Sequence, residues 1–119
     1  MSDNTTTIAE LKKTVDTFIA EREWHQFHTP KNLSMNIAIE AAELMEKFLW
    51  ITSEASRDEI DRNRQEIEDE VADIFASLLC FCNAANIDLT TALNNKMVKS
   101  AQKYPVEKAR GKYTKYNKL

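Results

Sequence analysis

The sequence has 119 residues, of which 43% are hydrophobic and 29% charged, with 1 glycine and 2 prolines. This length and balance are typical of one globular domain and exclude a disordered chain. The scarcity of glycine and proline argues against a β-protein with many tight turns and against a glycine-rich phosphate loop. No apolar run approaches the ~18 residues that a membrane span needs, and the polar N-terminus is unlike a secretory signal, so we expect a cytoplasmic protein.

The net charge of −3 conceals two regions of opposite sign. Residues 40–73 carry 12 of the 19 acidic side chains, and residues 96–119 carry 8 of the 16 basic ones. An acidic middle suits cations and a basic end suits phosphates or an acidic partner, although solvated helix faces give the same composition. The two cysteines, Cys80 and Cys82, lack zinc-finger spacing and are interpreted as reduced thiols.

Hydrophobic periodicity predicts an all-α fold with four helices. The predicted helices cover about residues 7–24, 33–51, 57–85 and 89–104. Pro30 disfavours helix just before it, which separates the first two. Ser56 and Glu59 have the spacing of a capping box that would begin the third helix, and Asp88 is expected to cap the fourth. Pro105 should end the fourth helix.

These elements predict one four-helix domain at 1–104 and a basic C-terminal tail at 105–119. The tail is polar and is expected to be loosely held until a ligand or a neighbouring subunit orders it.

Two of the predicted helices carry matching pairs of acidic residues. Glu40 and Glu43 lie three positions apart in the second helix, and Glu70 and Asp73 repeat that spacing in the third. Each pair borders an apolar helical stripe, so packing of the two stripes would bring the four carboxylates together. Four ionised carboxylates in a partly apolar site require a compensating cation, and oxygen ligands favour Mg²⁺.

Two other interpretations of these acids remain open at this stage. Acidic residues at i, i+3 are common on ordinary solvated helix faces. A di-iron carboxylate bundle would carry Glu-x-x-His pairs. The only histidines, His25 and His28, lie outside both helices, which argues against iron and for a redox-inert hard ion.

The chain resembles the MazG-like all-α nucleoside triphosphate pyrophosphohydrolases, and within them the dCTP pyrophosphatase branch. The resemblance covers about residues 10–114, and four motifs carry it. They are Glu40-Ala41-Ala42-Glu43 with Glu70-Val71-Ala72-Asp73, WHQFHTPKNL at 24–33, Phe48-Leu49-Trp50, and Lys103-Tyr104-Pro105 with Lys112-Tyr113-Thr114. It implies a MazG-like four-helix bundle.

The resemblance also implies a reaction. Glu40, Glu43, Glu70 and Asp73 would hold Mg²⁺ against the triphosphate, and a metal-activated water would attack the α-phosphorus, giving a nucleoside monophosphate and pyrophosphate. Glu43 is the first choice as general base. The expected substrate is dCTP or a 5-modified dCTP, with a broader or dUTP-type preference as the alternative.

Base preference stays open because two positions depart from the animal members of that branch. Those members carry a histidine on the first helix and a tyrosine one turn after the aspartate. The aligned residues here are Val15 and Ser77.

The same resemblance implies a set of substrate-binding residues. Aromatic side chains are expected to stack on the base, and a histidine to bond the sugar or base. Lysines on one face of the fourth helix suit the β- and γ-phosphates. The expected set is Trp24, His28, Lys31, Asn32, Trp50, Lys96, Lys103 and Tyr104.

Wide apolar arcs on the second and third helices predict a homodimer whose helices complete the bundle, and the family suggests a homotetramer of two such dimers. Two other functions remain open: a non-catalytic nucleotide- or partner-binding bundle, and a nucleic-acid binder that uses Tyr113 and Tyr116 of the tail. Four crowded carboxylates argue against the first, and a pI of 5.4 argues against the second. We expect neither polymeric nucleic acid nor a membrane as partner.

Overall fold

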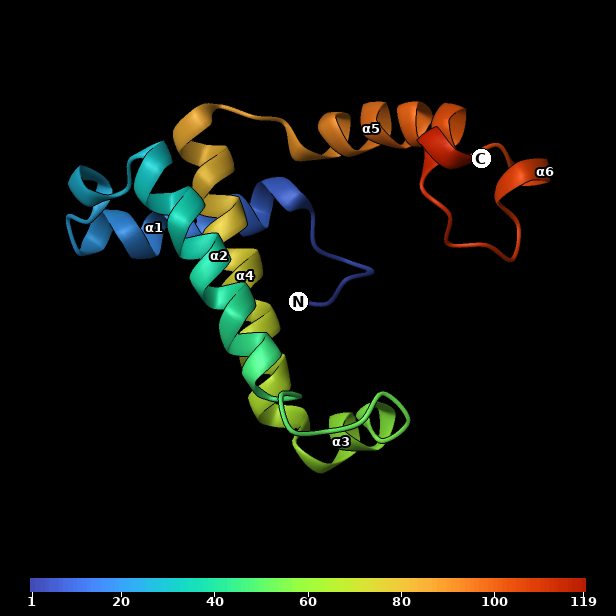
Figure 1. The fold of residues 1–119 in the computed structure, drawn as a ribbon. Helices are drawn as coiled ribbons and strands as arrows, with labels where there is room; N and C mark the ends of the chain where they lie inside the picture. Colours follow the sequence, from blue (N-terminus) through green and yellow to red (C-terminus); the bar gives the residue numbers. More distant parts are fainter. The chain divides into compact units, whose positions relative to one another are not determined.

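The computed structural model describes residues 1–119 and contains helices but no strand (Figure 1). The α-helices are α1 (Ile8–Glu21), α2 (Pro30–Glu46), α3 (Ser56–Arg62), α4 (Arg64–Ala85), α5 (Leu89–Lys103) and α6 (Val106–Ala109). Two 3-10 turns, η1 (His25–Phe27) and η2 (Tyr116–Lys118), complete the elements. The predicted all-α class is confirmed. The chain forms two compact units, Met1–Asn86 and Ile87–Leu119.

Helices α1 and α5 both begin at side-chain caps. Thr7 and Glu10 form a reciprocal capping box at α1, in which Glu10 N donates to Thr7 Oγ1 over 3.1 Å and Thr7 N donates to Glu10 Oε2 over 3.2 Å. The predicted cap of α5 is confirmed, because Asp88 Oδ2 accepts a hydrogen bond from Thr91 N over 3.1 Å.

The predicted bounds of the second helix are wrong at both ends. α2 begins at Pro30, since proline is favoured in the first helical turn and Thr29 Oγ1 caps it by accepting from Asn32 N over 3.2 Å. The helix ends at Glu46, five residues earlier than predicted. There the chain tightens into 3-10-type turns, with Phe48 N donating to Met45 O over 3.0 Å.

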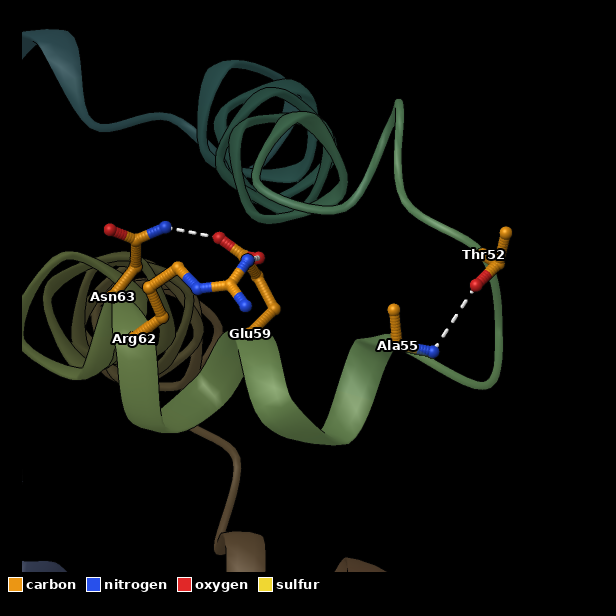
Figure 2. Close-up of polar contacts among 5 residues, drawn as sticks. All are labelled: Thr52, Ala55, Glu59, Arg62 and Asn63. Atoms are coloured by element: carbon orange, nitrogen blue, oxygen red, sulfur yellow. Dashed lines mark hydrogen bonds and ion pairs between the residues drawn. The ribbon is translucent and has the colours of Figure 1, made fainter.

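The long third helix predicted over 57–85 is also wrong, because it is broken into α3 and α4 at Asn63. Asn63 leaves helical geometry at φ −123° and ψ 37° and donates its side-chain amide to the carboxylate of Glu59 (Figure 2). Glu59 is 5% exposed and also pairs with Arg62 Nη1 over 3.1 Å. An asparagine side chain that bonds one turn back offers the backbone an alternative to continued helix.

The predicted cap at Ser56 is wrong as well. Ser56 is the first residue of α3, and its hydroxyl donates to Ser53 O over 2.7 Å instead of capping the helix. Ala55 precedes it, and Ala55 N donates to Thr52 Oγ1 over 3.2 Å, which closes the turn before α3 (Figure 2).

The core of the first unit lies between α1, α2 and α4, where α2 and α4 run side by side (Figure 1). Its buried apolar side chains are Ile19, Leu33, Ile67, Leu79 and Cys82. Three of these belong to α4, so this helix is the centre of the unit. A four-helix bundle completed by a second copy stays a prediction.

The second unit contains α5, α6 and η2, so the predicted tail also includes short helices. Within it the Tyr104 and Tyr116 rings meet edge to face at 6.1 Å, and Lys103 Nζ lies 4.7 Å from the Tyr116 ring centre. The division into 1–104 and 105–119 stays a prediction. No single helix is long and apolar enough to cross a membrane. By length and composition alone, α4 and α5 pass this test only when they are counted together as one broken span.

Candidate active site

Polar pairs at two levels hold α2 and α4 in a defined antiparallel register. Asn36 Nδ2 donates to Ser77 Oγ over 2.7 Å, and Lys47 Nζ lies 3.5 Å from Glu66 Oε2. From Asn36 to Lys47 the chain advances by the same number of residues as it goes back from Ser77 to Glu66 on α4. Glu40 and Glu43 of α2 therefore face Asp73 and Glu70 of α4.

The four acidic side chains converge, as their spacing predicts. One carboxylate oxygen from each of them lies within 4.8 Å of the others. Glu40, Glu43 and Glu70 are half-buried, whereas Asp73 is exposed. The Oε2 atoms of Glu40 and Glu70 are buried and have no hydrogen-bond partner. Buried carboxylate oxygens without donors are costly, and an all-oxygen ligand set of this kind fits a hard divalent cation.

The crowding changes the proton affinity of two of these acids. The pKa of Glu43 is raised above 4.5, first by its hydrogen bond with Glu40 and then by the negative charge of Glu40. The pKa of Glu70 is raised first by burial and then by the charge of Glu43, while Lys47 acts in the opposite direction. Without a cation, the cluster therefore lowers its repulsion by holding protons more tightly.

A pocket of about 470 Å³ opens between α1, α2 and α4, with Glu40 and Asp73 at its edge. Its other walls are mostly apolar. The ring of Phe18 meets that of Trp24 edge to face at 5.9 Å, and Arg22 stacks on Phe18 at 3.6 Å from the ring centre. A pocket that joins an aromatic wall to carboxylates suits a ligand with a flat ring and a metal-binding anionic end.

The structure places some of the predicted binding residues in this pocket and others outside it. Trp24 and His28 line it. Asn32 instead donates to Phe27 O over 2.9 Å, which holds the loop before α2, and its neighbour Lys31 is exposed. Trp50 is 92% exposed beyond the end of α2 and is not among the lining residues.

The remaining predicted binding residues belong to the second unit, 87–119, and their contribution to the site stays a prediction. They are Lys96, Lys103 and Tyr104.

Sequence reasoning missed Phe18 and Asn36, which both line the pocket. Phe18 belongs to the apolar stripe of α1 and reads as core, although it is 48% exposed. Asn36 shares the helical stripe of Glu40, and this was an available signal, because a polar residue on that stripe must face the same helix. Ser77, like Val15, is one of the two departures on which base preference depends, and both residues line the pocket.

A further contact positions the loop that carries Trp24 and His28. His25 Nε2 lies 2.7 Å from Asp16 Oδ1 and so ties η1 to α1.

The MazG-like family model matches residues 35–119, and the chain belongs to this family. The resemblance predicted from the motifs is thus confirmed. dCTP pyrophosphatase 1 of Bos taurus is 33% identical over 115 residues, which cover 95% of this chain and 68% of that protein. The Homo sapiens protein of the same name is 31% identical over the same shares. A solved pyrophosphatase structure from Archaeoglobus fulgidus DSM 4304 has 37% identity and a TM-score of 0.81, and covers 88% of this chain and 98% of its own.

Proposed function

We propose that the chain is a Mg²⁺-dependent nucleoside triphosphate pyrophosphohydrolase that converts dCTP, or a 5-modified dCTP, and water to the monophosphate and pyrophosphate. The names of its relatives support a hydrolase that acts on nucleotide anhydrides. The observation that carries the proposal is the convergence of four carboxylates, two with buried unpaired oxygens, at the edge of a pocket with an aromatic wall.

In this proposal Glu40, Glu43, Glu70 and Asp73 hold the metal ion. Bound Mg²⁺ neutralises phosphate oxygens and lowers the pKa of the attacking water. The water oxygen bonds to the α-phosphorus, and the bond from that phosphorus to the bridging oxygen of pyrophosphate breaks. Glu43 is our candidate for accepting the water proton, because it belongs to the carboxylate cluster beside which the attacking water would lie.

The proposed substrate contacts follow the pocket and the family motifs. Trp24, with Phe18 beside it, supplies an apolar wall for the base, and His28 a polar group near it. The other proposed contacts are Lys31, Asn32, Trp50, Lys96, Lys103 and Tyr104. Because Trp50 is exposed, its proposed contact is with a nucleotide bound at a neighbouring subunit of a homodimer or homotetramer.

A product assay with a panel of deoxy- and ribonucleoside triphosphates and Mg²⁺ tests the proposal. We expect a monophosphate and pyrophosphate, with dCTP among the best substrates. Glu43→Gln should lower kcat by about 100-fold or more, the usual contribution of a general base. Glu68→Gln, which changes an exposed acid on α4 outside the cluster, should retain activity.

Other products or rankings would contradict specific parts of the proposal. Release of inorganic phosphate would exclude attack at the α-phosphorus. Preferential cleavage of dUTP would support the alternative substrate class. Nucleotide binding without any cleavage would support the non-catalytic binding module.

A further inference from the structure

One polar pair bridges α2 and α4 inside the otherwise apolar part of the pocket. Asn36 Nδ2 donates to Ser77 Oγ over 2.7 Å, and both residues line the pocket. Ser77 is only 7% exposed. Their pocket neighbours include Leu33, Ile19 and Ala76, which offer no side-chain hydrogen bonds. A buried polar pair in such surroundings costs desolvation, and the cost is offset when a ligand completes its hydrogen bonds.

The pair retains hydrogen-bonding capacity that the structure does not use. The Ser77 oxygen accepts from Asn36, so the Ser77 hydroxyl proton is available for donation. Asn36 keeps its carbonyl oxygen and a second amide hydrogen. Together they present a donor and an acceptor close to each other, which is the complement of a ligand hydroxyl, because a hydroxyl both donates and accepts.

The register of the two helices determines which part of a nucleotide this pair meets. Asn36 precedes Glu40 by four residues on α2, and Ser77 follows Asp73 by four residues on α4. Since the helices are antiparallel, both steps lead in the same direction, about 6 Å along the axis from the acids. In a nucleotide whose α-phosphate lies at the acids, the sugar comes next, and the base beyond it reaches Trp24.

We infer that Asn36 and Ser77 bind the 3′-hydroxyl of the nucleotide sugar and make it a requirement for efficient hydrolysis. This inference rests on the function proposed above. In this arrangement, the phosphates lie at the four carboxylates between α2 and α4. The sugar lies about one helical turn away, at Asn36 and Ser77. The 3′-hydroxyl donates to the Asn36 carbonyl oxygen and accepts from the Ser77 hydroxyl.

The test compares the deoxynucleoside triphosphate that the wild type hydrolyses best with its 2′,3′-dideoxy counterpart. We expect kcat/KM to be about 10-fold lower for the dideoxy form, the usual effect of leaving buried uncharged partners unpaired. The sugar ratio is defined as kcat/KM for the deoxy form divided by kcat/KM for the dideoxy form. We expect Ser77→Ala and Asn36→Ala each to reduce the sugar ratio to about 2-fold or less, because each variant slows hydrolysis of the deoxy form. Ser34→Ala, which removes an exposed hydroxyl from α2, should keep the wild-type ratio.

A binding measurement separates this inference from the proposed reaction. Titration calorimetry measures the Kd of deoxy- and dideoxynucleoside 5′-monophosphates, which the enzyme cannot hydrolyse to pyrophosphate. The ratio of the dideoxy Kd to the deoxy Kd should follow the same pattern across the wild type and the variants as the ratio of kcat/KM values. If the wild type cleaves no nucleotide but the binding ratios follow the expected pattern, the proposed function fails and the inference stands. A wild-type ratio near 1, or a ratio that survives in both variants, overturns the inference. If the variants change the ranking of bases but leave the sugar ratio constant, Asn36 and Ser77 contact the base, and the inference is also overturned.

Discussion

At the scale of single residues, Glu43 and Glu70 have raised pKa values for different reasons. Contact with Glu40 dominates at Glu43, whereas burial dominates at Glu70. Both groups bind protons more tightly in the folded chain than in the unfolded chain. The stabilisation from these protons is present below about pH 4.5, the ordinary pKa of a glutamate, and is lost as the pH rises through the higher pKa values of the folded chain. In the proposed function, a bound divalent cation would replace the protons as the compensating charge.

The melting temperature of the protein should therefore respond to Mg²⁺ more strongly at high pH. We expect the metal-free protein to lose stability as the pH rises above about 4.5, and Mg²⁺ to raise Tm more at pH 8 than at pH 5. Calorimetric melts with and without the metal measure this. Glu70→Gln should weaken the Mg²⁺ effect, and Glu68→Gln should preserve it. An equal shift in Tm at both pH values would refute the linkage.

At the scale of elements, the break between α3 and α4 depends on a buried acid. Glu59 accepts from Asn63 and pairs with Arg62, and the three side chains point toward one another (Figure 2). Capping-box spacing at Ser56 and Glu59 points to the right helix start but assigns Glu59 the wrong partner. The sequence pattern is local, whereas the burial of Glu59 follows from packing that no spacing rule contains.

Removal of the Glu59 carboxylate should destabilise the fold. Glu59→Ala leaves Asn63 and Arg62 without their acceptor, so we expect the free energy of unfolding to fall by about 2 kcal/mol. Urea denaturation measures the change. Glu59→Gln keeps a neutral acceptor and should cost less, while Asp58→Ala changes the exposed neighbour and should stay within about 0.5 kcal/mol. Equal effects of the Glu59→Ala and Asp58→Ala changes would contradict a structural role for this contact.

At the scale of the whole molecule, the first unit leaves large apolar side chains exposed on α2 and α4, the two helices that carry the four acids. Met35, Ile39 and Met45 of α2 are 56%, 54% and 71% exposed, and Val71 of α4 is 50% exposed. Apolar surface of this extent favours association with another surface. It supports the proposed homodimer, in which α2 and α4 of a second copy complete the bundle.

A charge on this surface should dissociate the dimer. Ile39→Asp would bury an unpaired carboxylate in the interface and weaken association by about 2–5 kcal/mol. Sedimentation velocity should show a dimer or tetramer for the wild type and a smaller species for the variant. Lys13→Asp, on α1, is the matched surface control and should leave the assembly unchanged. A wild type that sediments as a monomer would contradict the proposed dimer.

Local sequence patterns were enough to predict the all-α class, the acid pairs and the family. These conclusions depend on local spacing, since periodicity specifies which face of a helix a residue occupies. The same spacing also predicted that Glu40, Glu43, Glu70 and Asp73 would meet if their stripes packed.

The axial alignment of α2 and α4 is set by packing, because periodicity defines the faces of two helices but not their position along each other. That alignment pairs Asn36 with Ser77 and Lys47 with Glu66, with the four acids between them. Packing also decided that Phe18 borders a pocket instead of filling the core. Each of these outcomes depends on contacts between residues distant in the chain, which are set only when the helices pack.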